Sequence, residues 1–334
     1  MKLQLTSRRI AVSLGIALSL AATGCGSSGG GASRATIISY GGVQEQGASG
    51  YASALLQGYF DREGLKFSPT WATSGAVLLQ GLVGGDFQVA NIGPSQLYAA
   101  IENGACARVL RPTEGAAYGL IAQPKLHLNR ELPYPAVLEQ MKGRTIGIAA
   151  RGAAQELVLR KLLKDAGLNP DSDVTWLAIG AGATATAAFA AEKVDILMSV
   201  SQIEENLQAN GTKFDKLLNL SGPDSVLGTF WQAIAAANCK WADDHPDTVM
   251  KFCRALNRGF DALANDPAAG PKAFAYVKMG SDLGHSTRLW EKYKTPVIRI
   301  PAFNEQNWAY QARFTPDNYT PDFSKYVVDG CATA

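Results

Sequence analysis

The sequence predicts an α/β protein built from two lobes that are joined by two chain crossings. Short β-rich runs alternate with stretches of helical periodicity, which is the pattern of an open α/β sheet. The alternation starts again near the middle of the chain. About 300 residues follow the N-terminal segment, more than one hydrophobic core usually holds. Two lobes joined twice form a hinge that can close over a ligand.

The first lobe is predicted to begin with a strand over Thr36–Tyr40, which runs into a glycine pair. Apolar residues at helical spacing then indicate a helix, and Pro94 marks the start of a later one, because proline fits the first helical turn. In order, the further predicted elements are helix Ala52–Arg62, strand Leu65–Trp71, helix Ala76–Val83, strand Phe87–Ile92, helix Ser95–Asn103 and strand Arg108–Pro112.

The second lobe repeats the same alternation, and a helical region follows it. Its predicted elements are strand Thr145–Ala150, helix Ala153–Asp165, strand Val174–Ile179, helix Thr184–Glu192 and strand Val194–Val200. After Phe230–Ala237 the predicted helices are Pro246–Asn265, Pro267–Val277, Ser286–Tyr293 and Asn304–Gln311.

Two segments are predicted to cross between the lobes. The first, Gln123–Met141, contains three prolines, and the second is Gly222–Trp231. These crossings assign residues 35–122 and 228–334 to a discontinuous first lobe and residues 123–227 to the second lobe.

The N-terminal segment has the layout of an export signal. Three basic residues precede the apolar run Ile10–Leu20, which is too short to span a bilayer as a stable helix. A cysteine follows at the expected cleavage point, and this arrangement resembles the lipobox of bacterial lipoproteins. We therefore expect residues 1–24 to be a lipoprotein signal peptide and Cys25 to be the lipidated first residue of an exported, membrane-anchored protein.

A glycine- and serine-rich stretch follows the signal, so residues 25–34 are predicted to form a flexible tether. An ordinary secreted protein with an incidental Cys25 is the alternative. The pair Arg8-Arg9 leaves Sec and Tat export both open.

Composition excludes nucleic acid as a partner. Removing the three basic residues of the signal from the total of 31 leaves 28 against 29 acidic residues, a mature net charge of about −1. Such a chain has no basic footprint for a phosphate backbone. The remaining cysteines permit two disulfides in three connectivities, or buried free thiols, and the sequence does not choose between these. They are Cys106, Cys239, Cys253 and Cys331.

The sequence lacks the motifs of an enzyme or a metal site. His127, His245 and His285 have no partner at metal-ligand spacing, and no CxxC pair, GxSxG elbow or P-loop is present. We therefore expect a non-enzyme without metal or cofactor.

Glycine- and serine-rich loops follow several predicted strands and stand directly before helices. Ligands of open α/β sheets bind beyond the carboxyl ends of strands, where helix N-termini offer free N–H groups to anions. Taken singly, each loop is equally explained as a cap or turn. Arg151 could bind a sulfonate or carboxylate through two hydrogen bonds, and Trp231 could form a wall of the cleft.

Five segments, in order along the chain, resemble the nitrate/sulfonate/taurine-type solute-binding proteins of ABC importers. They are Gly58–Leu65, Gly81–Ala90 with Gly93, Lys142–Gly147, Leu162–Val174 and Ala188–Ile196. The resemblance covers about residues 35–280. It implies a type II periplasmic-binding-protein-like fold and a monomer that delivers a small organic anion to a permease and its ATPase.

The resemblance also implies a set of ligand-contacting residues. They are Gln44, Gln46, Thr73, Ser74, Ser95, Arg151, Gly152, Ala153, Thr184, Ser199 and Trp231. Where the family often has Gly-Ser or Gly-Thr in the second-lobe loop, this chain has Arg151-Gly152-Ala153-Ala154. That departure favours a larger carboxylate or sulfonate, including aromatic ones, over nitrate or taurine. Two alternatives stay open: a sensory binding domain, and a pyrimidine- or menaquinone-pathway enzyme relative on the same fold.

Overall fold

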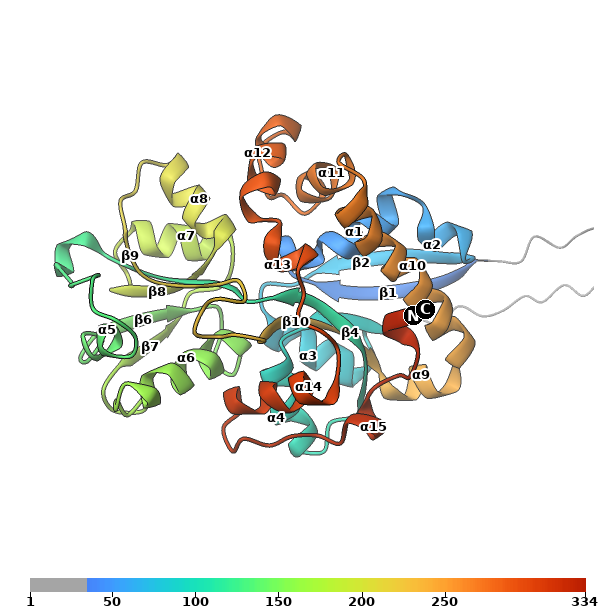
Figure 1. Ribbon diagram of the computed structural model, residues 1–334, viewed down its shortest axis with the longest axis horizontal. Coiled ribbons are helices and arrows are strands. Elements are labelled where there is room, and N and C mark those ends of the chain that lie inside the picture. The colour runs from blue at the N-terminus through green and yellow to red at the C-terminus, as the bar shows by residue number, and fades with distance from the viewer. Residues whose placement is uncertain (1–34) are drawn as a thin grey trace, which may run out of the picture. The chain divides into compact units, whose positions relative to one another are not determined.

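The computed structural model describes residues 35–334, so the predicted signal peptide, the tether and Cys25 lie outside the described residues. The described part contains two five-stranded sheets, each flanked by helices (Figure 1). The predicted α/β class and the two-lobe architecture are confirmed.

The first sheet has the strand order β2-β1-β3-β10-β4. β1 is parallel to β2 and β3, whereas β10 is antiparallel to β3 and β4. The carboxyl ends of β1, β3 and β4 therefore share one edge with the start of β10. The strands are β1 Thr36–Gly42, β2 Leu65–Trp71, β3 Val89–Ile92, β4 Ala107–Gly115 and β10 Trp231–Asn238.

The second sheet follows the same plan in the order β7-β6-β8-β5-β9. β6 is parallel to β7 and β8, and β5 is antiparallel to β8 and β9. The strands are β5 Ala117–Ala122, β6 Thr145–Ile148, β7 Thr175–Ala178, β8 Ile196–Val200 and β9 Asp215–Ser221.

The chain first passes between the sheets earlier than the sequence predicted. The expected crossing Gln123–Met141 is wrong, because β5 pairs with β8 and β9 and the passage lies at Ala116. All six residues of β5 are buried, so the strand lacks the polar alternation that marks a half-exposed one. The chain returns over residues 222–230, which overlaps the predicted second crossing.

The helices cover both sheets (Figure 1). They are α1 Ser49–Leu56, α2 Tyr59–Arg62, α3 Gly75–Gly84, α4 Pro94–Glu102, α5 Ala136–Glu139, α6 Ala154–Asp165, α7 Ala183–Ala190, α8 Ser201–Ala209, α9 Cys239–Asp244, α10 Pro246–Asn265, α11 Ala269–Tyr276, α12 Leu283–Tyr293, α13 Thr295–Ile298, α14 Glu305–Gln311 and α15 Phe323–Tyr326. Short 3₁₀ turns are η1 Gln46–Ala48, η2 Pro124–Leu126, η3 Ala312–Phe314 and η4 Cys331–Thr333. The single helix predicted over Ala52–Arg62 is divided into α1 and α2, because Gly58 adopts a left-handed conformation with φ of 68°.

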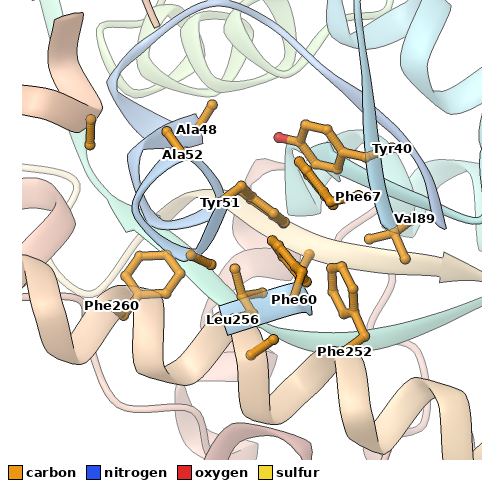
Figure 2. Packing of buried hydrophobic residues seen from close by; sticks show 14 of the residues in the cluster. Tyr40, Ala48, Tyr51, Ala52, Phe60, Phe67, Val89, Phe252, Leu256 and Phe260 are labelled. Atoms are coloured by element: carbon orange, nitrogen blue, oxygen red, sulfur yellow. The ribbon is translucent and has the colours of Figure 1, made fainter. Parts of the chain in front are cut away.

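Aromatic side chains pack α1, α2 and α10 onto the first sheet (Figure 2). The rings of Phe60 and Phe67 stack with centroids 4.4 Å apart, and Phe252 of α10 lies 5.5 Å from Phe60. Full burial of such a side chain contributes about 1.5–3 kcal/mol. This core holds α1, and with it the loop that precedes α1, against the first sheet.

Two disulfides tie the first lobe together and resolve the pairing that the sequence left open. Cys106, before β4, bonds to Cys239, after the adjacent strand β10. Cys253 of α10 bonds to Cys331 near the C-terminus.

The segment after α14 packs against both lobes. Trp308 belongs to a first-lobe cluster, whereas Phe314 is buried in the second-lobe cluster with its ring 4.8 Å from that of Phe230. Residues 228–334, assigned to the first lobe from the sequence, thus also contribute Phe230 and Phe314 to the core of the second lobe.

Candidate functional site

A cavity of about 90 Å³ lies between the facing edges of the two sheets. The first lobe lines it with residues from the loop after β1, from α3 and α4, and from the facing ends of β4 and β10. The second lobe contributes the start of β5 and the loops before α6 and α7. Its lining includes Glu45, Ser74, Gln96, Glu114, Tyr118 and Gln232.

Local structure brings helix N-termini to this cavity. The hydroxyl of Ser74 accepts a hydrogen bond from the Val77 amide and so caps α3. The starts of α4 and α6 approach each other across the lobes at Gly93 and Ala154. A Cβ placed on Gly93 would lie 2.3 Å from the Ala154 Cβ, so only glycine permits this approach.

Two carboxyl groups line the cavity. Glu114, at the end of β4, is 2% exposed, and Glu45 is partly buried. Burial raises the pKa of Glu114 to about 8, and the charge of Glu45 adds to the rise. Burial likewise raises the pKa of Glu45 to about 7. Each carboxyl therefore takes up a proton near neutral pH when no cation pairs with it.

Several buried polar atoms at the cavity have no partner within residues 35–334. They are Oε1 of Glu114 and both polar atoms of the Gln96 amide, whose side chain is only 3% exposed. Gln232 is satisfied, since its Oε1 accepts from the Ala117 amide at 2.9 Å and its Nε2 donates to Glu114 Oε2 at 3.3 Å. Such unpaired groups at a cavity are those that a bound molecule would satisfy.

Tyr118 forms an aromatic wall from the second lobe. It is 5% exposed, and its pKa is raised by burial and further by the nearby charges of Glu114 and Glu45. The cavity thus places carboxylates of the first lobe next to an aromatic ring of the second.

Of the residues expected to contact ligand, Ser74 and Ala153 line this cavity. Arg151 does not: it is exposed, and its guanidinium pairs with Glu156 at 3.0 Å. Gly152 donates its amide to the same carboxylate at 2.7 Å. The physical reason is that Glu156, buried in the first turn of α6, pairs with the Arg151 guanidinium and accepts the Gly152 amide, so both groups have a local partner.

The other expected residues also lie outside the cavity, each for a local reason. Thr73 and Thr184 are exposed, and Thr184 bonds to the Ala181 carbonyl of its own turn. Ser199 is buried and donates to Glu204 within the second lobe. Trp231 is fully buried in the first lobe and donates to the Pro301 carbonyl.

Three further candidates do not line this cavity: Gln44 in the loop after β1, Gln46 in η1 and Ser95 in the first turn of α4. Gln44 is partly buried in the loop after β1, and Ser95 is buried with its hydroxyl unpartnered among the described residues. Gln46 lines a neighbouring cavity of about 340 Å³, which shares Tyr118 with the first one.

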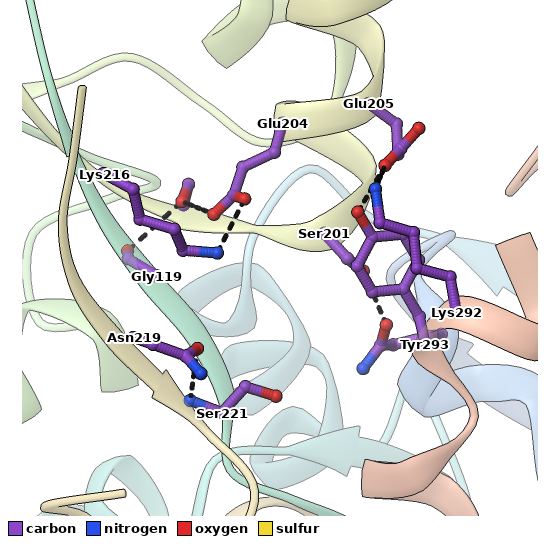
Figure 3. Close-up of polar contacts among 11 residues, drawn as sticks. Gly119, Ser201, Glu204, Glu205, Lys216, Asn219, Ser221, Lys292 and Tyr293 are labelled. Carbon is purple, nitrogen blue, oxygen red and sulfur yellow. Dashed lines mark hydrogen bonds and ion pairs between the residues drawn. The ribbon is translucent and has the colours of Figure 1, made fainter. Parts of the chain in front are cut away.

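The neighbouring cavity contains two lysines, and both are paired (Figure 3). Lys216 lies 2.9 Å from Glu204 within the second lobe. Lys292 of α12 lies 2.5 Å from Glu205 of α8, which also accepts from Tyr293. Burial opposes ionisation of Glu205, but the hydrogen bonds from Lys292 and Tyr293 outweigh it and lower its pKa.

Helix α8 therefore connects the lobes through its first turns. Besides Glu205, Ser201 donates to Gln46 Oε1 at 2.6 Å, and Gln202 donates to the Lys278 carbonyl at 2.8 Å. We refer to these bonds, with those of Glu205, as the interlobe contacts of α8. They bond the second lobe to the first beside the cavities.

Sequence reasoning missed the carboxylates and amides of the cavity. Glu45 lies between two predicted ligand contacts, Gln44 and Gln46, and Gln96 directly follows the predicted contact Ser95. Glu114 carried no such signal, because the strand was predicted to end at Pro112 and the crossing at Ala116 follows only from the pairing of β5. Within residues 35–334, no group of three or more metal-ligating side chains occurs.

Comparisons with known proteins agree with this architecture. A protein of Bordetella bronchiseptica RB50 is 20% identical with a TM-score of 0.74, over 89% of this chain and 96% of that one. The alkanesulfonate-binding protein SsuA of Xanthomonas axonopodis pv. citri, bound to MOPS, is 20% identical with a TM-score of 0.68, over 89% and 99%. The nitrate-binding protein NrtA of Synechocystis PCC 6803 is 13% identical with a TM-score of 0.62, over 87% and 84%.

These identities show a shared fold. None of the curated proteins compared with the chain matches it significantly. The pattern of the family described as "NMT1/THI5 like" matches residues 45–270, which is more than half of the chain. The chain therefore belongs to the NMT1/THI5 like family.

Proposed function

We propose that this protein is the solute-binding component of an ABC-type importer and has no catalytic role. The observation that carries the proposal is a cavity enclosed by the facing edges of two sheets and lined by buried polar atoms without partners. Proteins of the same fold are named as periplasmic sulfonate- and nitrate-binding proteins, which supports a solute-binding role here.

Binding and hinge motion are coupled in this proposal. The chain crosses between lobes at Ala116 and over residues 222–230, so the lobes can separate by changes confined to these segments. A solute that contacts both edges favours the closed state, and the interlobe contacts of α8 add to it. The permease would then recognise the closed form.

Export and lipid anchoring at Cys25 remain part of the proposal. Two disulfides support an oxidising compartment, because such bonds are rare in the cytosol of mesophiles. None of the helices in residues 35–334 has the length and apolar character needed to cross a membrane. The expected anchor lies outside the described residues.

The preference for a larger carboxylate or sulfonate depended on Arg151, which pairs with Glu156 outside the cavity. The resemblance to sulfonate- and nitrate-binding proteins still favours an anion, whereas the charges at the cavity do not. A sensory role, in which the closed form docks on a receptor, would use the same site.

Native mass spectrometry of the full-length protein, purified gently from its own membranes, tests the proposed function. We expect a retained small molecule and a mass increment at Cys25 from the lipid. A protein that carries no solute, and that no small molecule stabilises against heat, would contradict the proposal; a saturating ligand at 100 times Kd adds about 2.7 kcal/mol.

A further inference from the structure

The charged side chains around the cavity are all acidic. Glu45 and Glu114 line it, and within residues 35–334 neither lysine nor arginine does. Arg111, on the same strand as Glu114, is used elsewhere: it donates to Asn257, and its guanidinium lies 4.2 Å from the Phe260 ring centroid.

One of these carboxylates is deeply buried and has one oxygen without a partner. Glu114 is only 2% exposed, its Oε2 accepts a 3.3 Å bond from Gln232, and its Oε1 has no hydrogen-bond partner in the described chain. The Gln46 side chain also lies near this carboxyl and lowers its pKa, against the larger effect of burial. Gln96, equally buried, adds an unpaired amide. The Glu114 carboxyl packs directly against Gly47: a Cβ at that position would lie 2.4 Å from Oε2 of Glu114.

An anion in this cavity would face two carboxyl groups in a region of low dielectric. Both would have to stay protonated, or like charges would be buried together, which is strongly unfavourable. A cation has the opposite effect: it pairs with the ionised carboxylates, and its N–H groups can donate to the free oxygen of Glu114. Tyr118 lines the same cavity from the second lobe, and an aromatic ring beside a cation can add a cation–π attraction.

We propose that the cavity binds a small organic cation, an ammonium or amidinium, between Glu45 and Glu114 of the first lobe and Tyr118 of the second. Its N–H groups donate to Glu114 Oε1 and the Glu45 carboxylate, and the Gln96 amide orients the rest of the molecule. Because these residues come from both lobes, the cation closes the hinge. This inference rests on the proposed solute-binding function and names its substrate class.

The test compares probes that differ only in their head group. Propylammonium and benzylammonium are titrated into the full-length protein at mildly alkaline pH, alongside propanesulfonate and phenylmethanesulfonate, and binding is followed by calorimetry and thermal shift. We expect only the ammonium probes to bind. Glu114→Gln and Glu45→Gln should each weaken that binding by roughly tenfold or more, since each removes a charge-assisted hydrogen bond. Glu102→Gln, on the exposed face of α4, is the matched control and should leave it unchanged.

Other outcomes separate the two proposals. Binding of the sulfonates in preference to the ammonium probes overturns the cation and leaves the solute-binding function in place. If no probe binds, the molecule retained on the native protein decides: a cation supports the inference, and an anion or a neutral molecule overturns it. A protein that binds no probe and retains no molecule overturns the proposed function and the inference with it.

Discussion

Replacing Glu114 with glutamine should make the unliganded protein more stable at alkaline pH. The native pKa of Glu114 is raised by burial from 4.5 to about 8, and the charge of Glu45 adds to the rise. Because its pKa is higher in the native than in the unfolded state, the contribution of Glu114 to the free energy of unfolding is greatest below about pH 4.5 and is lost as pH rises to about 8. At about 1.4 kcal/mol per pH unit, this loss amounts to ~5 kcal/mol.

The glutamine amide keeps an acceptor for the Gln232 bond and cannot ionise, so the variant should not show this loss. Urea unfolding at a series of pH values between about 5 and 9 gives the free energy of unfolding of both proteins. The difference between them isolates the Glu114 contribution, except for its coupling to Glu45, with which it titrates as a pair. Glu102→Gln controls for a simple change in net charge. Parallel stability curves for wild type and Glu114→Gln would refute the burial argument.

Three further predictions concern closure and stability. Gly93→Ala should weaken solute binding by roughly tenfold or more, because its Cβ would meet that of Ala154 at 2.3 Å and keep the lobes apart; Ala154→Gly in the same protein should restore binding, and a failure to do so would disprove the steric explanation. Glu205→Gln should open the lobes and lower affinity for the solute a few-fold, because a partly exposed ion pair contributes about 0.2–1 kcal/mol. Since the Glu205 pKa is lowered, the wild-type lobes should also open as pH falls through that pKa. An unchanged radius of gyration in small-angle X-ray scattering would count against this. Replacing both Cys253 and Cys331 with serine removes a disulfide between residues 78 apart and should lower the free energy of unfolding, measured in urea, by about 4 kcal/mol, because the unfolded chain is no longer constrained. A loss below about 1 kcal/mol would show that the C-terminus is held mainly by packing.

Local patterns were enough to predict most of the elements. The strand predicted over Leu65–Trp71 coincides with β2, and the helix predicted over Pro246–Asn265 coincides with α10. Both carry their information in residues close in sequence: a bounded β-rich run in one, and apolar periodicity behind an N-terminal proline in the other. The split between α1 and α2 was missed because a glycine within a helical pattern does not reveal its backbone conformation.

Local sequence patterns did not reveal which sheet contains strand β5. Its residues are uniformly buried, so nothing in them states which sheet they join. That choice is made by pairing with β8 and β9, which lie some 80 and 100 residues further along the chain, and it moves the first crossing to Ala116.

The sequence by itself determined the fold class, the family resemblance and the edge of the sheets at which a ligand would bind. The alternation of strands and helices places the loops that follow each strand before a helix N-terminus, and so indicates the binding edge without side-chain detail. Only the tertiary structure decided which side chains occupy that edge. Arg151 pairs with Glu156 in the first turn of α6, five residues further along the chain, and is lost to the site, whereas Glu114 is enclosed by residues distant in sequence. The charge of a binding site depends on which ionisable side chains are buried in it and which are already paired with other residues. Both depend on how the two lobes pack against each other.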